Sequence, residues 1–171
     1  LVQRAEPFEP QPGDQLILLD SSWHAQYFSQ VESLKARGIR IIAVIYDLIP
    51  ITRPEFFEER LKDTFCRWFD WISHQADGYM SISKAVRDEV YQELCRRLGQ
   101  QAADKLSHGY FHLGSELDLR QAGQPPMQQL SDLFQQGAQV FLAVSTIEPR
   151  KNHGYLLDAF ELAWAAGSEA R

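Results

Sequence analysis

The sequence contains little cysteine and no long apolar run. Its two cysteines, Cys66 and Cys95, each stand alone in a segment of helical pattern, so neither a disulfide framework nor a structural zinc site is expected. No apolar stretch reaches the roughly 18 residues of a membrane-spanning helix. The first residues carry charges and early prolines and do not resemble a signal peptide. These features predict a cytoplasmic protein.

An excess of positive charge is also missing, since the formal net charge is -6. Nucleic-acid binding depends on Lys and Arg neutralising phosphates, so no nucleic-acid partner is expected. The 171 residues, 44% of them hydrophobic, are enough to bury the core of one domain and to begin another.

Apolar runs alternate with helical patterns through the first two thirds of the chain. Short apolar runs typical of buried strands occupy residues 15–20 (QLILLD), 39–46 (IRIIAVIY) and 79–82. Helical spacing of apolar residues fills the intervals, at about residues 21–37, 54–74 and 83–98. Strand, helix and strand joined by short turns make a parallel crossover unit. The pattern therefore predicts an α/β fold, a Rossmann-like parallel sheet flanked by helices.

The composition changes after about residue 100. Gly114, Gly123, Pro125 and Pro126 interrupt the pattern and indicate a domain boundary, which we place at residue 120. Residues 1–120 are then part of a first domain, and residues 121–171 hold a linker and the start of a second. The second part is predicted to contain a short helix at about 127–136, a strand at 139–146 (QVFLAVST) and a helix at 153–166. One strand and one helix bury too little surface alone, so we expect the chain to be a fragment that can self-associate.

The sharpest candidate site lies between that last strand and helix, in the sequence Glu148-Pro149-Arg150-Lys151-Asn152. In open α/β sheets, ligands bind at the carboxyl ends of the strands, and the free N–H groups of a helix start favour an anion. Arg150 and Lys151 add two cations, and Asn152 is expected to cap the helix. The plain alternative is that both cations are ordinary solvated charges.

Other candidates follow the first two predicted strands. Asp20, Trp23 and His24 come after the first strand, and Tyr46 and Asp47 end the second, so all five are expected at the same sheet edge. Trp23 could stack on the face of a bound ligand, or it could simply cover the core. Asp47 could bind a substrate hydroxyl, or it could be a turn residue before Pro50. Both alternatives stay open.

Several segments resemble one family of enzymes. Residues 144–152 (VSTIEPRKN) with 156–160 (LLDAF), and the supporting runs 47–50, 76–84 and 111–118, are similar to retaining family 4 glycosyltransferases, in particular to bacterial mannosyltransferase-like members. The resemblance implies a GT-B architecture, in which two Rossmann-like domains face each other across a cleft. The chain would then hold most of the N-terminal, acceptor-side domain and only the first strand and helix of the C-terminal, donor-side domain.

The resemblance also implies a function. The enzyme would move a hexose such as mannose from a nucleotide sugar such as GDP-mannose to a bacterial glycan or lipid-linked glycan, with retention of anomeric configuration. Arg150 and Lys151 would bind the donor diphosphate, and neither a metal nor another cofactor is expected. The whole protein could lie at the inner face of the membrane. Two alternatives remain: a GT-B-fold nucleotide-sugar epimerase, and a non-catalytic α/β assembly module.

The chain departs from the family pattern at three places. The Gly-rich first loop and the later donor-side carboxylate pair are both absent from these 171 residues. Tyr46 stands where many members carry a histidine near the reacting sugar. The catalytic residues are therefore left unassigned.

Overall fold

The computed structural model describes residues 9–19, 22–24, 27–114 and 139–170. The chain forms two units, Leu1–Gly114 and Ser115–Arg171, and each is described by itself. The boundary predicted at residue 120 and the helix predicted at 127–136 lie outside the described residues.

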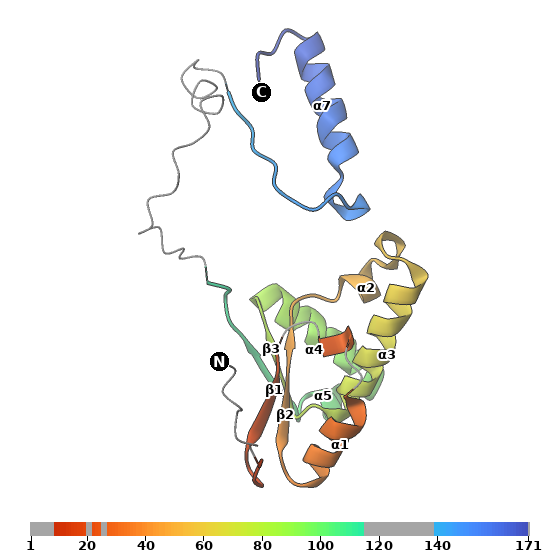
Figure 1. Ribbon diagram of the computed structural model, residues 1–171, viewed down its shortest axis with the longest axis vertical. Coiled ribbons are helices and arrows are strands. Elements are labelled where there is room, and N and C mark those ends of the chain that lie inside the picture. The colour runs from red at the N-terminus through yellow and green to blue at the C-terminus, as the bar shows by residue number, and fades with distance from the viewer. Residues whose placement is uncertain (1–8, 20–21, 25–26, 115–138, 171) are drawn as a thin grey trace, which may run out of the picture. The chain divides into compact units, whose positions relative to one another are not determined.

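A parallel sheet of four strands organises the first unit (Figure 1). Its strands are β1 (Gln15–Leu18), β2 (Arg40–Ile45), β3 (Gly78–Ser81) and β4 (Ser107–Tyr110). They lie in the order β1-β2-β3-β4, and every neighbouring pair is parallel. The predicted α/β fold with a Rossmann-like parallel sheet is confirmed.

Helices fill each connection between strands. The α-helices of this unit are α1 (Phe28–Ala36), α2 (Ile49–Thr52), α3 (Glu59–Gln75), α4 (Lys84–Leu98) and α5 (Gln100–Ala103). Two 3-10 turns, η1 (Ser22–His24) and η2 (Pro54–Phe56), precede α1 and α3. Because each strand pairs with the next one in sequence, right-handed crossovers bring the helices to one face of the sheet. Figure 1 shows α1 and α3 together on one side of the strands.

One hydrophobic cluster joins that face of the sheet to the helices. Its members on β2 alternate in sequence, as expected when successive side chains point to opposite faces. The cluster includes Ile41, Ala43 and Ile45 of β2, Tyr79 of β3, Phe69 and Ile72 of α3, and Val90 and Leu94 of α4. The Tyr79 hydroxyl donates to the carbonyl oxygen of Ile72 at 3.0 Å, which satisfies the one polar group of this large buried side chain.

Arg97 of α4 connects the two longest helices. Its guanidinium pairs with Asp70 of α3 and with Glu93 of its own helix, and it lies over the Phe69 ring at 5.0 Å from the ring centroid. The side chains of Arg97 and Glu93 are mostly buried, so this contact fixes α4 against α3.

The opposite face of the sheet is also apolar, and in the described part of the chain it is exposed at the β1 edge. Ile17 pairs with Ile42 in the register of β1 and β2, and Ile17 and Leu19 are more than half exposed. On the same face, a Cβ added to Gly109 of β4 would lie 2.4 Å from the sulfur of Met80. The glycine therefore leaves room for the methionine.

Two helices begin later than predicted. The helix expected at residue 21 starts at Phe28, because Ser22–His24 forms a 3-10 turn in which the Ser22 carbonyl accepts the Tyr27 hydroxyl. The helix expected at Pro54 starts at Glu59, after an extended residue at Phe57. The predicted helix ends at Gly38 and Gly99 are confirmed, since both glycines adopt positive φ.

In the second unit, residues 139–148 form no strand, so the strand predicted at 139–146 is wrong for this structure. A strand needs a neighbour to hydrogen-bond, and no described residue pairs with this segment. The predicted helix is confirmed as α7 (His153–Ala165), preceded by the 3-10 turn η3 (Pro149–Lys151). Phe160 contacts Phe141 and Trp164, with ring centroids 5.5 Å apart in each pair. Among the described residues, no helix has the length and apolar content needed to cross a membrane.

Candidate functional site

The basic loop of the second unit is ordered by a carboxylate. Arg150 Nε donates to Glu148 Oε2 at 2.7 Å, and Thr146 Oγ1 donates to Glu148 Oε1 at 2.6 Å. The Thr146 hydrogen bond, followed by the positive charge of Arg150, holds the pKa of Glu148 below its ordinary value. Glu148 therefore stays ionised and keeps the Arg150 side chain in one orientation.

Asn152 makes the turn between this loop and α7. Its φ of 52° lies in the left-handed region, which Asn tolerates better than most residues. The expectation that its side chain caps the helix is wrong, since that side chain makes no cap hydrogen bond. In the left-handed conformation Asn152 contributes through its backbone instead, and its carbonyl oxygen accepts the Leu156 N–H at 3.3 Å.

The helix start and the two cations together suit an anion. The first N–H groups of any helix lack partners within the helix and carry its positive dipole end. Arg150 and Lys151 precede that end directly, and no ion pair engages Lys151 among the described residues. Because Glu148 offsets one of the two charges, Lys151 and the helix start supply the net attraction.

Asp47, at the carboxyl end of β2, serves as a turn residue. Its Oδ1 accepts the backbone N–H of Ile49 at 3.0 Å, which fixes the entry into α2. Tyr46, the residue before it, is exposed. The structure thus gives Asp47 a local structural contact and leaves the Tyr46 ring accessible to solvent.

Trp23 and His24 lie in η1, against α3. The Trp23 ring meets the Phe65 ring edge-on with centroids 5.7 Å apart, and the His24 ring lies over Trp23 at 3.4 Å. Trp23 is therefore partly a core residue, as the plain alternative predicted. Asp20 lies outside the described residues.

A surface groove of about 990 Å³ runs between η1, α1 and the first half of α3. We call it the α1–α3 groove. Its lining includes Trp23, His24, Glu32, Glu58, Arg60 and Arg67, but neither Tyr46 nor Asp47. The sequence placed these candidate residues at one sheet edge together. In the structure Trp23 and His24 line the α1–α3 groove, whereas Tyr46 and Asp47, which follow β2, do not.

Sequence reasoning missed two sets of residues. Glu148 was not recognised as the partner of Arg150, although an acid two residues before a cation is a visible signal. The polar lining of the groove on α3 was also missed. Arg60, Thr64 and Arg67 recur at helical spacing beside the apolar stripe, and this pattern could have identified them.

Comparisons with known proteins agree with the resemblance in the sequence. Three curated relatives from Escherichia coli, each named serotype-specific mannosyltransferase WbdA, are 30%, 30% and 29% identical to this chain over 96%, 96% and 95% of its length. The chain spans about a fifth of their length, 21%, 20% and 20%. No family model matches the sequence, and no solved structure matches it. The predicted resemblance to bacterial mannosyltransferase-like glycosyltransferases is thereby confirmed, and it covers nearly the entire chain.

Proposed function

We propose that this chain is part of a retaining glycosyltransferase of the GT-B type, which transfers mannose from a nucleotide sugar such as GDP-mannose to a bacterial glycan. One observation carries the proposal: a chain similar to mannosyltransferases over 96% of its length presents Arg150 and Lys151 directly before the start of α7. The acceptor is a glycan or a lipid-linked glycan.

In this proposal the basic loop binds the donor diphosphate. Transfer forms a bond between an acceptor hydroxyl oxygen and the anomeric carbon, while the bond from that carbon to the diphosphate oxygen breaks. The departing diphosphate gains negative charge and takes up the hydroxyl proton. Arg150, Lys151 and the N–H groups of α7 stabilise this developing charge. Such contacts speed the reaction because they are stronger in the transition state than in the ground state.

Glu148 has a positioning role in this scheme. It holds Arg150 through the Nε atom, which leaves the two terminal amino groups of the guanidinium for phosphate oxygens. A positioned cation loses less side-chain entropy on binding than a free one. Glu148→Gln should therefore weaken donor binding less than removal of Arg150 does.

The test is calorimetric titration of the full chain with GDP-mannose, for the unmodified protein and for the double variant Arg150→Ala/Lys151→Ala. Each charge-assisted hydrogen bond contributes about 1.5 to 3 kcal/mol, so the double variant should bind at least about tenfold more weakly. The matched control is Arg40→Ala/Arg53→Ala, which removes two exposed cations of the first unit and should leave the affinity unchanged.

Two results would contradict the proposal. One is an unchanged affinity for GDP-mannose in the Arg150/Lys151 variant. The other is equal binding of mannose and GDP-mannose, because a site that recognises the diphosphate must distinguish them.

A further inference from the structure

We propose that the α1–α3 groove is a binding site for a neutral oligosaccharide, formed by residues other than the edge residues Tyr46 and Asp47. The choice of a glycan as the ligand class rests on the proposed function. The location of the site rests on the side chains that line the groove.

The groove offers an aromatic surface beside its polar groups. The neighbouring rings of Trp23 and His24, tilted by 32° to each other, form this surface, and the edge contact with Phe65 supports Trp23 from the core side. A sugar ring presents C–H groups on its faces, and an indole or imidazole face is a matching apolar partner.

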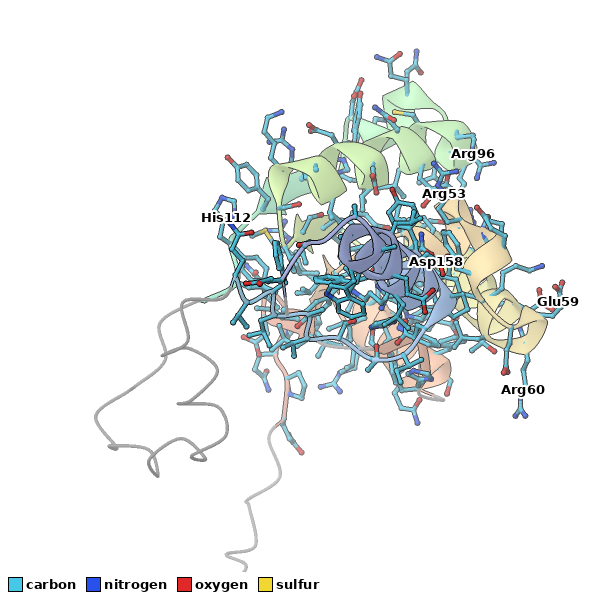
Figure 2. All side chains as sticks on the ribbon, turned by 90° about the horizontal axis from the view of Figure 1, so that it is seen from above. Arg53, Glu59, Arg60, Arg96, His112 and Asp158 are labelled. Carbon is cyan, nitrogen blue, oxygen red and sulfur yellow. The ribbon has the colours of Figure 1, made fainter. Side chains whose placement is uncertain are left out.

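The charged side chains of the groove differ from their neighbours on α3 in making no ion pair among the described residues. On α3, Glu59 pairs with Lys62, and Asp70 pairs with Arg97. By contrast, Glu58, Arg60 and Arg67 make no ion pair within the part of the chain that the structure describes. Figure 2 shows the Arg60 side chain extending from α3 into solvent.

Two of these polar groups are held in place and keep free bonding positions. Trp71 Nε1 donates to Glu32 Oε1 at 2.8 Å, and the stacked Phe28 ring, 4.1 Å away between centroids, fixes Trp71. Glu32 Oε2 stays available. Arg67 donates through Nε to the Asp63 carbonyl at 3.3 Å, which leaves its two terminal amino groups. Planar carboxylate and guanidinium groups can each bind two neighbouring hydroxyls.

The charge balance favours an uncharged ligand. The lining holds two carboxylates, Glu32 and Glu58, and two guanidinium groups, Arg60 and Arg67, so the groove has no net charge that would select a phosphate or a polyanion. Its volume of about 990 Å³ is at the upper end of ligand sites, which run from about 300 to 1,000 Å³. This size suits several linked sugar rings better than a single one.

The experiment measures binding of a mannose tetrasaccharide to the full chain by NMR titration of the backbone and indole N–H signals. We expect shifts at Trp23 and at the first half of α3. The double variant Arg60→Ala/Arg67→Ala should weaken binding about tenfold or more, because hydrogen bonds to charged groups are lost. Both arginines are exposed, so the fold is retained, whereas Trp23→Ala would also remove packing against Phe65.

The control variant Arg40→Ala/Arg53→Ala lies outside the groove and should bind the tetrasaccharide as the unmodified chain does. Unchanged binding in the Arg60/Arg67 variant would overturn the location of the site. Binding of inorganic pyrophosphate in the groove, with none of the tetrasaccharide, would overturn the ligand class.

The two proposals fail separately. If GDP-mannose binding depends on Arg150 and Lys151 while the groove variant binds the tetrasaccharide normally, the groove assignment is wrong and the donor site stands. If the groove variant loses the tetrasaccharide while the Arg150/Lys151 variant binds GDP-mannose normally, the groove stands and the donor site is wrong.

Discussion

Both units contain apolar, strand-like sequences, but these sequences are buried in the first unit and exposed in the second. In the first unit, β2 (RIIAVI) lies between two partner strands, and Ile41 is 0% exposed. In the second, the segment VFLAVST has no partner among the described residues, and Leu142 is 88% exposed. No described residue of the second unit is buried.

This difference shows that an apolar strand sequence becomes buried only when other strands and helices of the fold cover it. Residues 139–146 are apolar on both faces, as expected of a central strand in a parallel sheet. Such a segment gains little from its own sequence, because hydrogen bonds and apolar cover both come from neighbours. The first unit supplies these neighbouring strands and helices from its own sequence.

The largest difference is expected between two aspartate substitutions. Phe69 of α3 is 0% exposed, so Phe69→Asp places an unpaired carboxylate in the core and should cost more than about 4 kcal/mol. This loss is comparable to the total stability of a small domain, so the first unit should not fold. Circular dichroism with urea denaturation measures the effect.

The matched control is Leu157→Asp in α7, where Leu157 is 62% exposed. We expect the free energy of unfolding to change by no more than about 0.5 kcal/mol, as for other surface substitutions. Loss of the folded first unit in this variant as well would remove the distinction between the two units.

A smaller effect is expected at the contact between α3 and α4. Arg97→Ala should lower the free energy of unfolding by about 1 to 3 kcal/mol, because it leaves the mostly buried Glu93 with one ion-pair partner fewer and removes the contact with the Phe69 ring. Arg96→Ala, which removes an exposed partner of the same carboxylate, should cost less than about 1 kcal/mol. Equal losses in the two variants would contradict the structural role given to Arg97.

The Arg97 effect should also depend on pH. Burial alone would raise the pKa of Glu93, but hydrogen bonds from Arg96 and Arg97 outweigh it and lower this pKa from its ordinary value of 4.5. A lowered pKa in the folded state means that the stabilisation is complete above pH 4.5 and is lost as the pH falls through the lowered value. The difference in stability between the unmodified chain and Arg97→Ala should therefore shrink in acid.

The last comparison concerns two glycines that each follow a helix with a positive φ. Gly99 follows α4 with φ of 83°, Gly167 follows α7 with φ of 89°, and neither has an atom within 4 Å of an added Cβ. Gly99→Ala should destabilise the first unit by about 1 to 3 kcal/mol through backbone strain alone, because φ of 83° with ψ of 151° is a conformation that essentially only glycine adopts. Gly167→Ala should leave the same unfolding transition unchanged. A shift of that transition in both variants would show that the units unfold together.

The alternation of apolar runs and helical patterns predicted the sheet and most of the helices because those signals are local. Gly38 and Gly99 predicted helix ends for the same reason, since their effect lies in their own backbone. The start of α1 was mispredicted because Ser22 looks like a helix cap, while a contact with Tyr27 shapes the turn there. The strand at 139–146 was mispredicted because strand formation depends on residues that are not adjacent in sequence.

The candidate sites could likewise be predicted only in part. The basic pair Arg150 and Lys151 could be predicted, since both precede a recognisable helix. The α1–α3 groove could not, because its lining comes from η1, α1 and α3, which are brought together only by the fold. Residues far apart in the sequence, such as Glu32 and Trp71, give no joint signal in a single chain.

The sequential strand order β1-β2-β3-β4 has a consequence for synthesis on the ribosome. Each strand pairs with the one made just before it, so the sheet can grow at one edge as the nascent chain emerges. No strand has to wait for a later one to be inserted beside it, and each pairing closes only one strand–helix–strand loop. Short loops of this kind favour rapid folding. The first unit is therefore suited to fold vectorially, from β1 to β4, during translation.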